Sequence, residues 1–159
     1  MSDTVKTGLL KTLETVLQGL PGIATIQRDC LFPLDLATIP LPALIFYEDL
    51  EDIKKGGRLN RNVIHLDLVM FEAFSSPVFD VGNTAWQDFK EAADQVAGEI
   101  HNLSFDPTAL AALYGAGLIL VEEVGNRKAP CNEYYGEMVL TVRLTYGHAL
   151  GDAFTTQVS

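Results

Sequence analysis

Residues 135–148 have the sequence YGEMVLTVRLTYGH, and this stretch decides the fold class. Apolar side chains occupy every second position from Met138 to Tyr146, and a period of two is typical of a β-strand. Val139, two threonines and Arg143 stand between them. The pattern predicts a long strand with one face buried in a core and a mixed face turned the other way.

A second long strand is predicted from Asn62 to Phe74, where one set of alternate residues between Ile64 and Met70 is wholly apolar. Ahead of it, Ala43 to Tyr47 predicts a shorter strand. The charged stretch from Glu48 to Arg58 between these two strands predicts a hairpin with a long, solvated tip, turned by its glycine pair. Two short strands are also predicted, Ile23 to Arg28 and Gly117 to Val124. Asn126 to Asn132 is predicted to be the connection from the second of these strands to the last strand.

Helical periodicity predicts an amphipathic helix from about Asp3 to Gln18. A second helix is expected to begin at Thr84, because Thr84 and Gln87 match a capping box. Asp106 before a proline predicts the start of a short third helix, Thr108 to Leu113. The apolar stripe of the second helix comprises Trp86, Phe89, Ala93, Val96, Ala97, Ile100 and Leu103.

These elements predict an α+β fold: a two-layer sandwich in which a mainly antiparallel mixed sheet carries two main amphipathic helices on one face. Residues 1–150 are expected to form a single domain. The remaining residues, 151–159, are expected to be a polar, flexible C-terminal tail.

Composition narrows the class of protein. Of the 159 residues, 48% are hydrophobic and 20% charged, as in ordinary folded domains. The net charge of −10 argues against a general binder of nucleic acid or anionic membranes, because such binders need Lys and Arg to pair with phosphate.

The sequence shows neither a signal peptide nor an apolar stretch of about 18 residues. We therefore expect a soluble protein of a cytoplasm, or of an assembly built there.

No motif for catalysis, for a cofactor or for a metal stands out, so the protein is expected not to be an enzyme. The three histidines, His65, His101 and His148, are isolated from each other and from the cysteines. Cys30 and Cys131 lie far apart in the sequence, which favours two free thiols. Glu122 and Glu123 are adjacent on a strand and point to opposite faces, so they cannot form a carboxylate pair by themselves.

Taken in order along residues 3–147, these features resemble the tail terminator, or tail completion, proteins of long-tailed bacteriophages. The resemblance depends on the leading helix, the charged hairpin, the central helix and three stretches of sequence. These stretches are RDCLFPLDLATIPLPALIFYED at 28–49, NRNVIHLDLVMFEAF at 60–74 and the strand at 135–148.

The resemblance implies a homo-oligomeric ring, usually of six copies, at the head-proximal end of the tail tube. Such a ring stops tube polymerisation and provides the surface to which the head attaches. Its partners would be the tail tube protein and the head–tail connector protein, and DNA would pass through its channel without specific binding. The protein would be part of the virion tail and would be assembled in the bacterial host cytoplasm, with no cofactor and no membrane partner.

Contacts between subunits, or with the tube, are expected from the hairpin Glu48 to Arg61 and the connection Asn126 to Tyr135. The hairpin separates its charges, with acids first and cations after. This pattern suits either a solvated tip or an arm that meets a complementary neighbour. Tyr134 and Tyr135 could equally pack against the sheet of their own chain instead of contacting a neighbour. The candidate interface residues are Glu48, Asp49, Glu51, Asp52, Lys54, Lys55, Arg58, Arg61, Arg127, Lys128, Tyr134, Tyr135 and Arg143.

Two other functions remain open. The first is a head–tail joining protein or another minor tail protein of similar build. The second, from a different class, is a small-molecule binding domain or an unrecognised enzyme, since α+β sandwiches host many functions. A deep pocket with convergent polar groups would be the mark of the second class.

Overall fold

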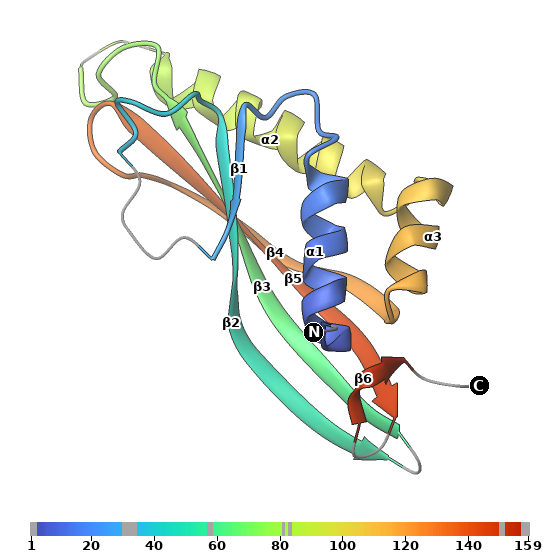
Figure 1. The fold of residues 1–159 in the computed structure, drawn as a ribbon. Coiled ribbons are helices and arrows are strands. Elements are labelled where there is room, and N and C mark those ends of the chain that lie inside the picture. The colour runs from blue at the N-terminus through green and yellow to red at the C-terminus, as the bar shows by residue number, and fades with distance from the viewer. Residues whose placement is uncertain are drawn as a thin grey trace.

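The structure is a computed structural model that describes residues 3–29, 35–56, 59–80, 82, 84–149 and 152–156. Within these residues the chain forms three helices and six strands (Figure 1). In chain order they are α1 Val5–Leu17, β1 Thr25–Arg28, β2 Ala43–Gly56, β3 Leu59–Ala73, α2 Ala85–Leu103, α3 Pro107–Gly115, β4 Leu118–Pro130, β5 Tyr135–Ala149 and β6 Asp152–Thr156.

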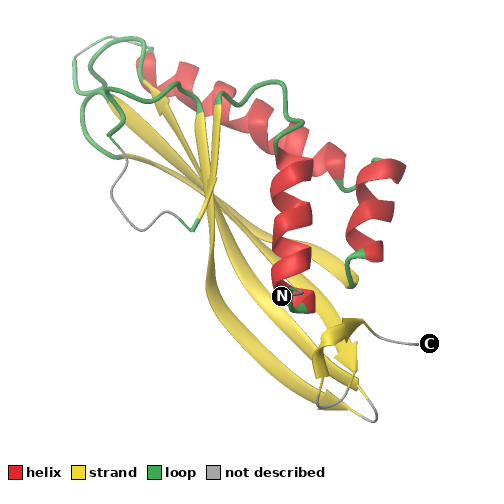
Figure 2. Cartoon of the chain, in the orientation of Figure 1, coloured by secondary structure: helices red, strands yellow, loops and turns green. Residues whose placement is uncertain are grey.

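The strands form one sheet in the order β1-β2-β3-β5-β4, and β6 pairs with the end of β5. Only β1 and β2 are parallel among these pairs, and the others are antiparallel. The helices lie on one side of the sheet (Figure 2). The predicted α+β two-layer sandwich with a mainly antiparallel mixed sheet is confirmed.

The core lies between the helices and the apolar faces of β3 and β5. The predicted faces are confirmed, because Leu66 and Leu68 of β3 pair in register with Val142 and Leu140 of β5, and all four side chains are at most 6% exposed. From α1, Leu9 and the buried residues one and two turns further along pack against this surface. Burial of each such side chain contributes about 1.5–3 kcal/mol.

The helix starts are largely as predicted, with one correction. The Asp106 carboxylate accepts hydrogen bonds from two backbone N–H groups of the first turn of α3, as expected of an N-cap. Thr84 does precede α2, but the capping box predicted with Gln87 is wrong. The backbone of Thr84 (φ −103°, ψ 9°) is not extended, and its hydroxyl donates to Asp88 instead.

The charged hairpin also differs from its prediction. Glu48 to Arg58 was expected to be a long, solvated tip, but β2 runs to Gly56 and β3 begins at Leu59. Ladder bonds join backbone groups, so the pairing continues through charged residues when both faces of the strands can reach water. A bulge interrupts the register between Glu48 and Leu50. Gly57 and Arg58 lie outside the described residues.

The connection predicted from Asn126 to Asn132 is strand for most of its length, because β4 continues to Pro130. This strand lies at the sheet edge and its residues 122–127 are all exposed, so this part of the sequence lacks the alternation that would have revealed a strand. The turn that follows is short. In it the Asn132 side chain accepts hydrogen bonds from the backbone N–H groups of Tyr134 and Tyr135.

The C-terminal tail needs a correction as well. Part of the segment 151–159, expected to be a flexible tail, forms the strand β6. His148 pairs with Thr156 and Ala149 with Asp152, so backbone hydrogen bonds hold this segment to the end of β5. No helix in the described part of the chain is both long enough and apolar enough to span a membrane.

Candidate functional site

Three of the predicted interface residues come together on the face of the sheet that the helices leave free. Asp52 of β2, Arg61 of β3 and Arg143 of β5 line a depression of about 290 Å³ that we call the open-face basin. The other lining residues are Val63, His65, Leu120, Glu122 and Thr145. Four strands contribute to the basin, so its geometry is fixed by the sheet itself.

Charges of both signs alternate across the basin. Arg143 lies in register between His65 on one side and Glu122 on the other. The His65 ring nitrogen Nε2 is 3.0 Å from a carboxylate oxygen of Asp52. The Nε atom of Arg143 is buried and has no hydrogen-bond partner among the described residues. Two guanidinium groups balanced by two carboxylates suit a complementary protein surface better than a polyanion.

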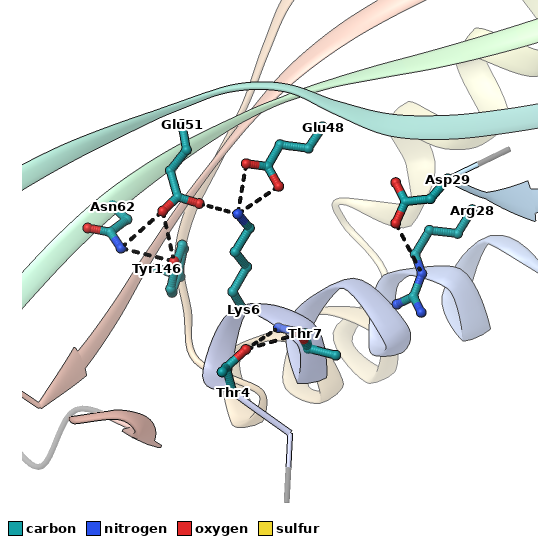
Figure 3. A network of polar contacts seen from close by, with 9 residues as sticks. All are labelled: Thr4, Lys6, Thr7, Arg28, Asp29, Glu48, Glu51, Asn62 and Tyr146. Carbon is teal, nitrogen blue, oxygen red and sulfur yellow. Dashed lines mark hydrogen bonds and ion pairs between the residues drawn. The ribbon is translucent and has the colours of Figure 1, made fainter. Parts of the chain in front are cut away.

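Two other predicted residues, Glu48 and Glu51, face the helix side and act within the chain. The ammonium group of Lys6 in α1 is 2.7 Å from the nearest carboxylate oxygen of Glu48 and 2.6 Å from that of Glu51 (Figure 3). Glu51 also approaches the Tyr146 hydroxyl, which accepts a hydrogen bond of 2.9 Å from the Asn62 side chain. These contacts join the start of α1 to the outer parts of β2, β3 and β5.

Burial and charge have opposite effects on the pKa of Lys6 in this joint between α1 and the sheet. Partial burial disfavours the charged form of Lys6, but the hydrogen bonds and negative charges of Glu48 and Glu51 outweigh it, so the pKa of Lys6 is raised. Burial, together with the charge of Glu51, also raises the pKa of Tyr146. The Lys6 ammonium is therefore charged at neutral pH, and the Tyr146 phenol is protonated.

The remaining predicted residues are divided between internal and exposed positions. Lys128 forms an ion pair of 2.7 Å with Asp94 of α2, so its charge is engaged within the chain. Asp49, Arg127 and Tyr134 are exposed, whereas Tyr135 is half-buried. The side chains of Lys54 and Lys55 and the whole of Arg58 lie outside the described residues. A contact with another subunit stays a prediction for every one of these residues.

Sequence reasoning missed an apolar cleft of about 400 Å³ between the helices and the β4 side of the sheet. Buried side chains such as Leu17, Leu68 and Leu113 line it, together with more exposed residues of the turn between α2 and α3. We call it the α3 cleft. The only sequence signal for it is an unusual number of apolar residues from 103 to 121, which by itself predicts core packing.

The mouth of the α3 cleft carries a few polar groups. The ring nitrogen Nδ1 of His101 is 3.1 Å from a carboxylate oxygen of Glu123, and the His101 ring packs edge-on against Phe105. Ser104 and Tyr114 also line the cleft. Neither here nor elsewhere in the described residues could a group of three His, Cys, Asp or Glu side chains hold a metal ion.

Comparisons with known proteins give no family. No protein-family model matches the chain, and no curated protein matches it. The resemblance to the tail terminator proteins therefore stays a prediction. The function proposed below depends on that resemblance and on the surfaces just described.

Proposed function

We propose that the chain is a structural virion assembly protein, the tail terminator of a long-tailed bacteriophage. In this role it forms a ring at the head-proximal end of the tail tube, stops tube polymerisation and provides the head-attachment surface. One observation carries the proposal beyond the sequence resemblance. The ends of β2, β3 and β5 project past α1 as an arm (Figure 1). The open face of these strands carries the open-face basin.

This arrangement favours association with copies of the same chain. The helices already cover the other face of the sheet, whereas the open-face basin, which reaches the arm through Asp52 and Arg61, is available to a neighbour. A contact between two different patches is heterologous, and it closes into a ring when its rotations sum to a full turn. The net charge of −10 suits a ring through which DNA passes without adhering.

Two measurements test the proposal. Light scattering gives the mass of the purified protein, and negative-stain images show the protein by itself and bound to isolated tail tubes. The expected result is a closed ring, formed free or on the tube end. Phage particles that lack the protein should carry overlong tubes. Tubes of normal length that fail to join heads would instead indicate a head–tail joining protein, and a chain that stays monomeric even on tubes would contradict the proposal.

The α3 cleft favours a second candidate, a small-molecule binding domain. Its volume of about 400 Å³ and its apolar walls lie within the range of ordinary ligand pockets. Thermal unfolding in the presence of a panel of small apolar compounds tests this candidate. A ligand that raises the melting temperature in proportion to the logarithm of its concentration would support it, and the absence of any shift would count against it.

A further inference from the structure

β4 forms one edge of the sheet, and no strand of the described residues lies beside its outer side. This edge is long, with 13 residues from Leu118 to Pro130, and every residue from 122 to 127 is exposed. The backbone N–H and C=O groups of an edge strand that point away from the sheet are able to pair with a strand of another chain. The outer side of β4 is therefore a template for one further strand.

β4 also carries charges and a bulge, two devices that usually prevent an edge strand from pairing with other chains. Glu122 and Glu123 precede the bulge, and Arg127 and Lys128 follow it. Because the sign of the charge changes across the bulge, an identical strand that runs antiparallel brings acids opposite cations. Opposite charges on facing residues stabilise an antiparallel pair. The order of the charges thus favours one partner, a second copy of β4.

The bulge decides whether these charges lie on the same face of the sheet. In a regular strand, residues 122 and 127 would point to opposite faces, because five positions separate them. In the structure, Glu122 pairs with Arg143 of β5 and Arg127 pairs with Val139. These two residues of β5 are four positions apart, so they share a face. The bulge therefore places Glu122 and Arg127 together on the open face.

One register satisfies both the charges and the faces. A two-fold axis perpendicular to the sheet, placed between Val124 and Gly125, puts Glu122 of each copy opposite Arg127 of the other copy. A register one residue away would bring Glu122 opposite a residue of the helix face. Across the axis the same register puts Leu120 opposite Ala129, both on the open face.

The pair of Glu122 and Arg127 is also the one whose charges are available. Glu123 is 3.1 Å from His101, and Lys128 forms its ion pair with Asp94, so both have partners within the chain. By contrast, Glu122 and Arg127 are exposed and form no ion pair with any described residue.

The edge strand also exposes apolar side chains. Leu120 and Val124 are each 47% exposed. Val124 lies next to the proposed axis, so its two copies are neighbours in the paired form. Covering apolar surface lowers the free energy, and the pairing removes part of both side chains from water. Backbone hydrogen bonds, charge and apolar burial therefore favour the same contact.

We propose that two copies of the chain pair in solution through β4, antiparallel, with Glu122 of each copy opposite Arg127 of the other. The two sheets then form one continuous sheet across the two-fold axis. Such a contact is isologous and closes with two copies, so it is distinct from the heterologous contact of a ring. The inference goes beyond the proposed function and does not depend on it.

Charge variants test the pairing, with the dissociation constant of the dimer measured by sedimentation equilibrium of the full chain. Glu122→Arg and Arg127→Glu each put like charges opposite each other twice, and each is expected to weaken the dimer about ten-fold or more. An equimolar mixture of these two variants is expected to form a one-to-one dimer, because every pair then has opposite charges. Glu91→Arg, the same change on an exposed residue of α2, is the matched control and is expected to dimerise like the parent chain. Circular dichroism shows that each variant has folded.

Cysteine cross-linking tests the register without changing any charge. In a Cys30→Ser, Cys131→Ser background, Val124→Cys places the two thiols beside the axis, within reach of a disulfide. Leu120→Cys is the matched control. Leu120 has the same exposed fraction, but its two copies would lie nine positions, or about 30 Å, apart along the paired strands. Mild oxidation is expected to link the Val124→Cys variant into a covalent dimer and to leave the Leu120→Cys variant unlinked.

The outcomes separate this inference from the proposed function. A parent chain that is monomeric at every concentration in solution would overturn the inference, as would a dimer that the charge variants leave unchanged. Efficient cross-linking of the Leu120→Cys variant would overturn the register. All these results would leave the tail terminator proposal standing, because that proposal is tested on tail tubes. A dimer with the expected register in a protein that binds no tail tube would support the inference and contradict the proposed function.

Discussion

Gly136 of β5 is packed against the ring of Phe89 from α2. A Cβ atom placed on Gly136 would lie 2.7 Å from the ring carbon Cε2 of Phe89, which is closer than carbon atoms approach in proteins. The Phe89 ring cannot retreat, because it is stacked on Trp86 and packed edge-on against Phe74. The close packing of α2 on β5 therefore requires a residue without a side chain at position 136.

Replacing Gly136 by Ala is expected to lower the free energy of unfolding by about 1–3 kcal/mol, the usual cost of overpacking a rigid core. Urea unfolding followed by circular dichroism measures the change. Gly98→Ala is the matched control, since nothing lies within 4 Å of its added Cβ in the middle of α2. It is expected to stabilise the protein by about 0.5–1 kcal/mol. Equal effects of the two changes would contradict the packing argument.

Cys131, in the turn between β4 and β5, is expected to be a slow nucleophile. Cys131 is exposed as a residue, but partial burial of its thiol, together with the charge of Glu137, raises the pKa of the thiol from 9.0 to about 11. Only the thiolate reacts, so its fraction at pH 8 is about 100-fold lower than for an unperturbed thiol. Alkylation by iodoacetamide in a Cys30→Ser background measures this rate. Urea should restore an ordinary rate, and fast alkylation of the folded protein would refute the prediction.

At the scale of elements, the ion pairs of Lys6 join α1 to β2. Replacing Lys6 by Met leaves two half-buried carboxylates facing each other, and we expect a loss of about 1–2 kcal/mol in the free energy of unfolding. Lys11→Met is the control. Its partner Asp3 is exposed, so its loss should cost at most about 0.5 kcal/mol.

The pH dependence of this joint has a definite sign. The pKa of Lys6 is raised in the folded protein, so its stabilising contribution is fully present below the unfolded value of 10.5. The contribution is lost only as the pH rises through the higher folded value. The difference in unfolding free energy between the parent and Lys6→Met should therefore be the same at pH 7 and pH 9. A difference that disappears by pH 9 would rule out the ion pairs as its source.

The elements differ in how well the sequence predicts them. β3 and β5 lie inside the sheet with one face in the core, so their apolar residues alternate and their positions are predictable. The outer half of β4 has no such alternation, because edge strands can be solvated on both sides. Local hydrogen bonding decides the capping of α2, and the rotation of the Thr84 backbone that prevents a capping box has no signature in the sequence.

The candidate site depends on a feature that the sequence does not reveal. The bulge at Asp49 shifts the alternation of β2 by one residue, so that Glu51 faces the helices and Asp52 faces the open-face basin. The charged residues were identifiable as candidates, but their division between an internal joint and an open surface was not. The α3 cleft depends on how α3 is placed against the sheet edge, which is a matter of tertiary packing.

At the scale of the whole molecule, one hydrophobic cluster includes residues of α1, α2, α3 and the central strands. The described domain is therefore expected to unfold in a single cooperative step. Trp86, the only tryptophan, reports on the packing of α2 against the sheet. Its fluorescence and the far-ultraviolet circular dichroism should follow the same urea transition. Separate midpoints would show that α2 and the sheet unfold independently.

The place of β5 in the sheet has a consequence for biosynthesis. β5 is the strand that joins β3 to β4, yet it is translated after both of them. Until it leaves the ribosome, β4 has no strand to pair with, and β3 lacks one of its two strand neighbours. Pairing between strands distant in sequence is slow and leaves unfinished edges open to aggregation. The nascent chain is thus expected to depend on protection, such as a chaperone provides, until β5 has been translated.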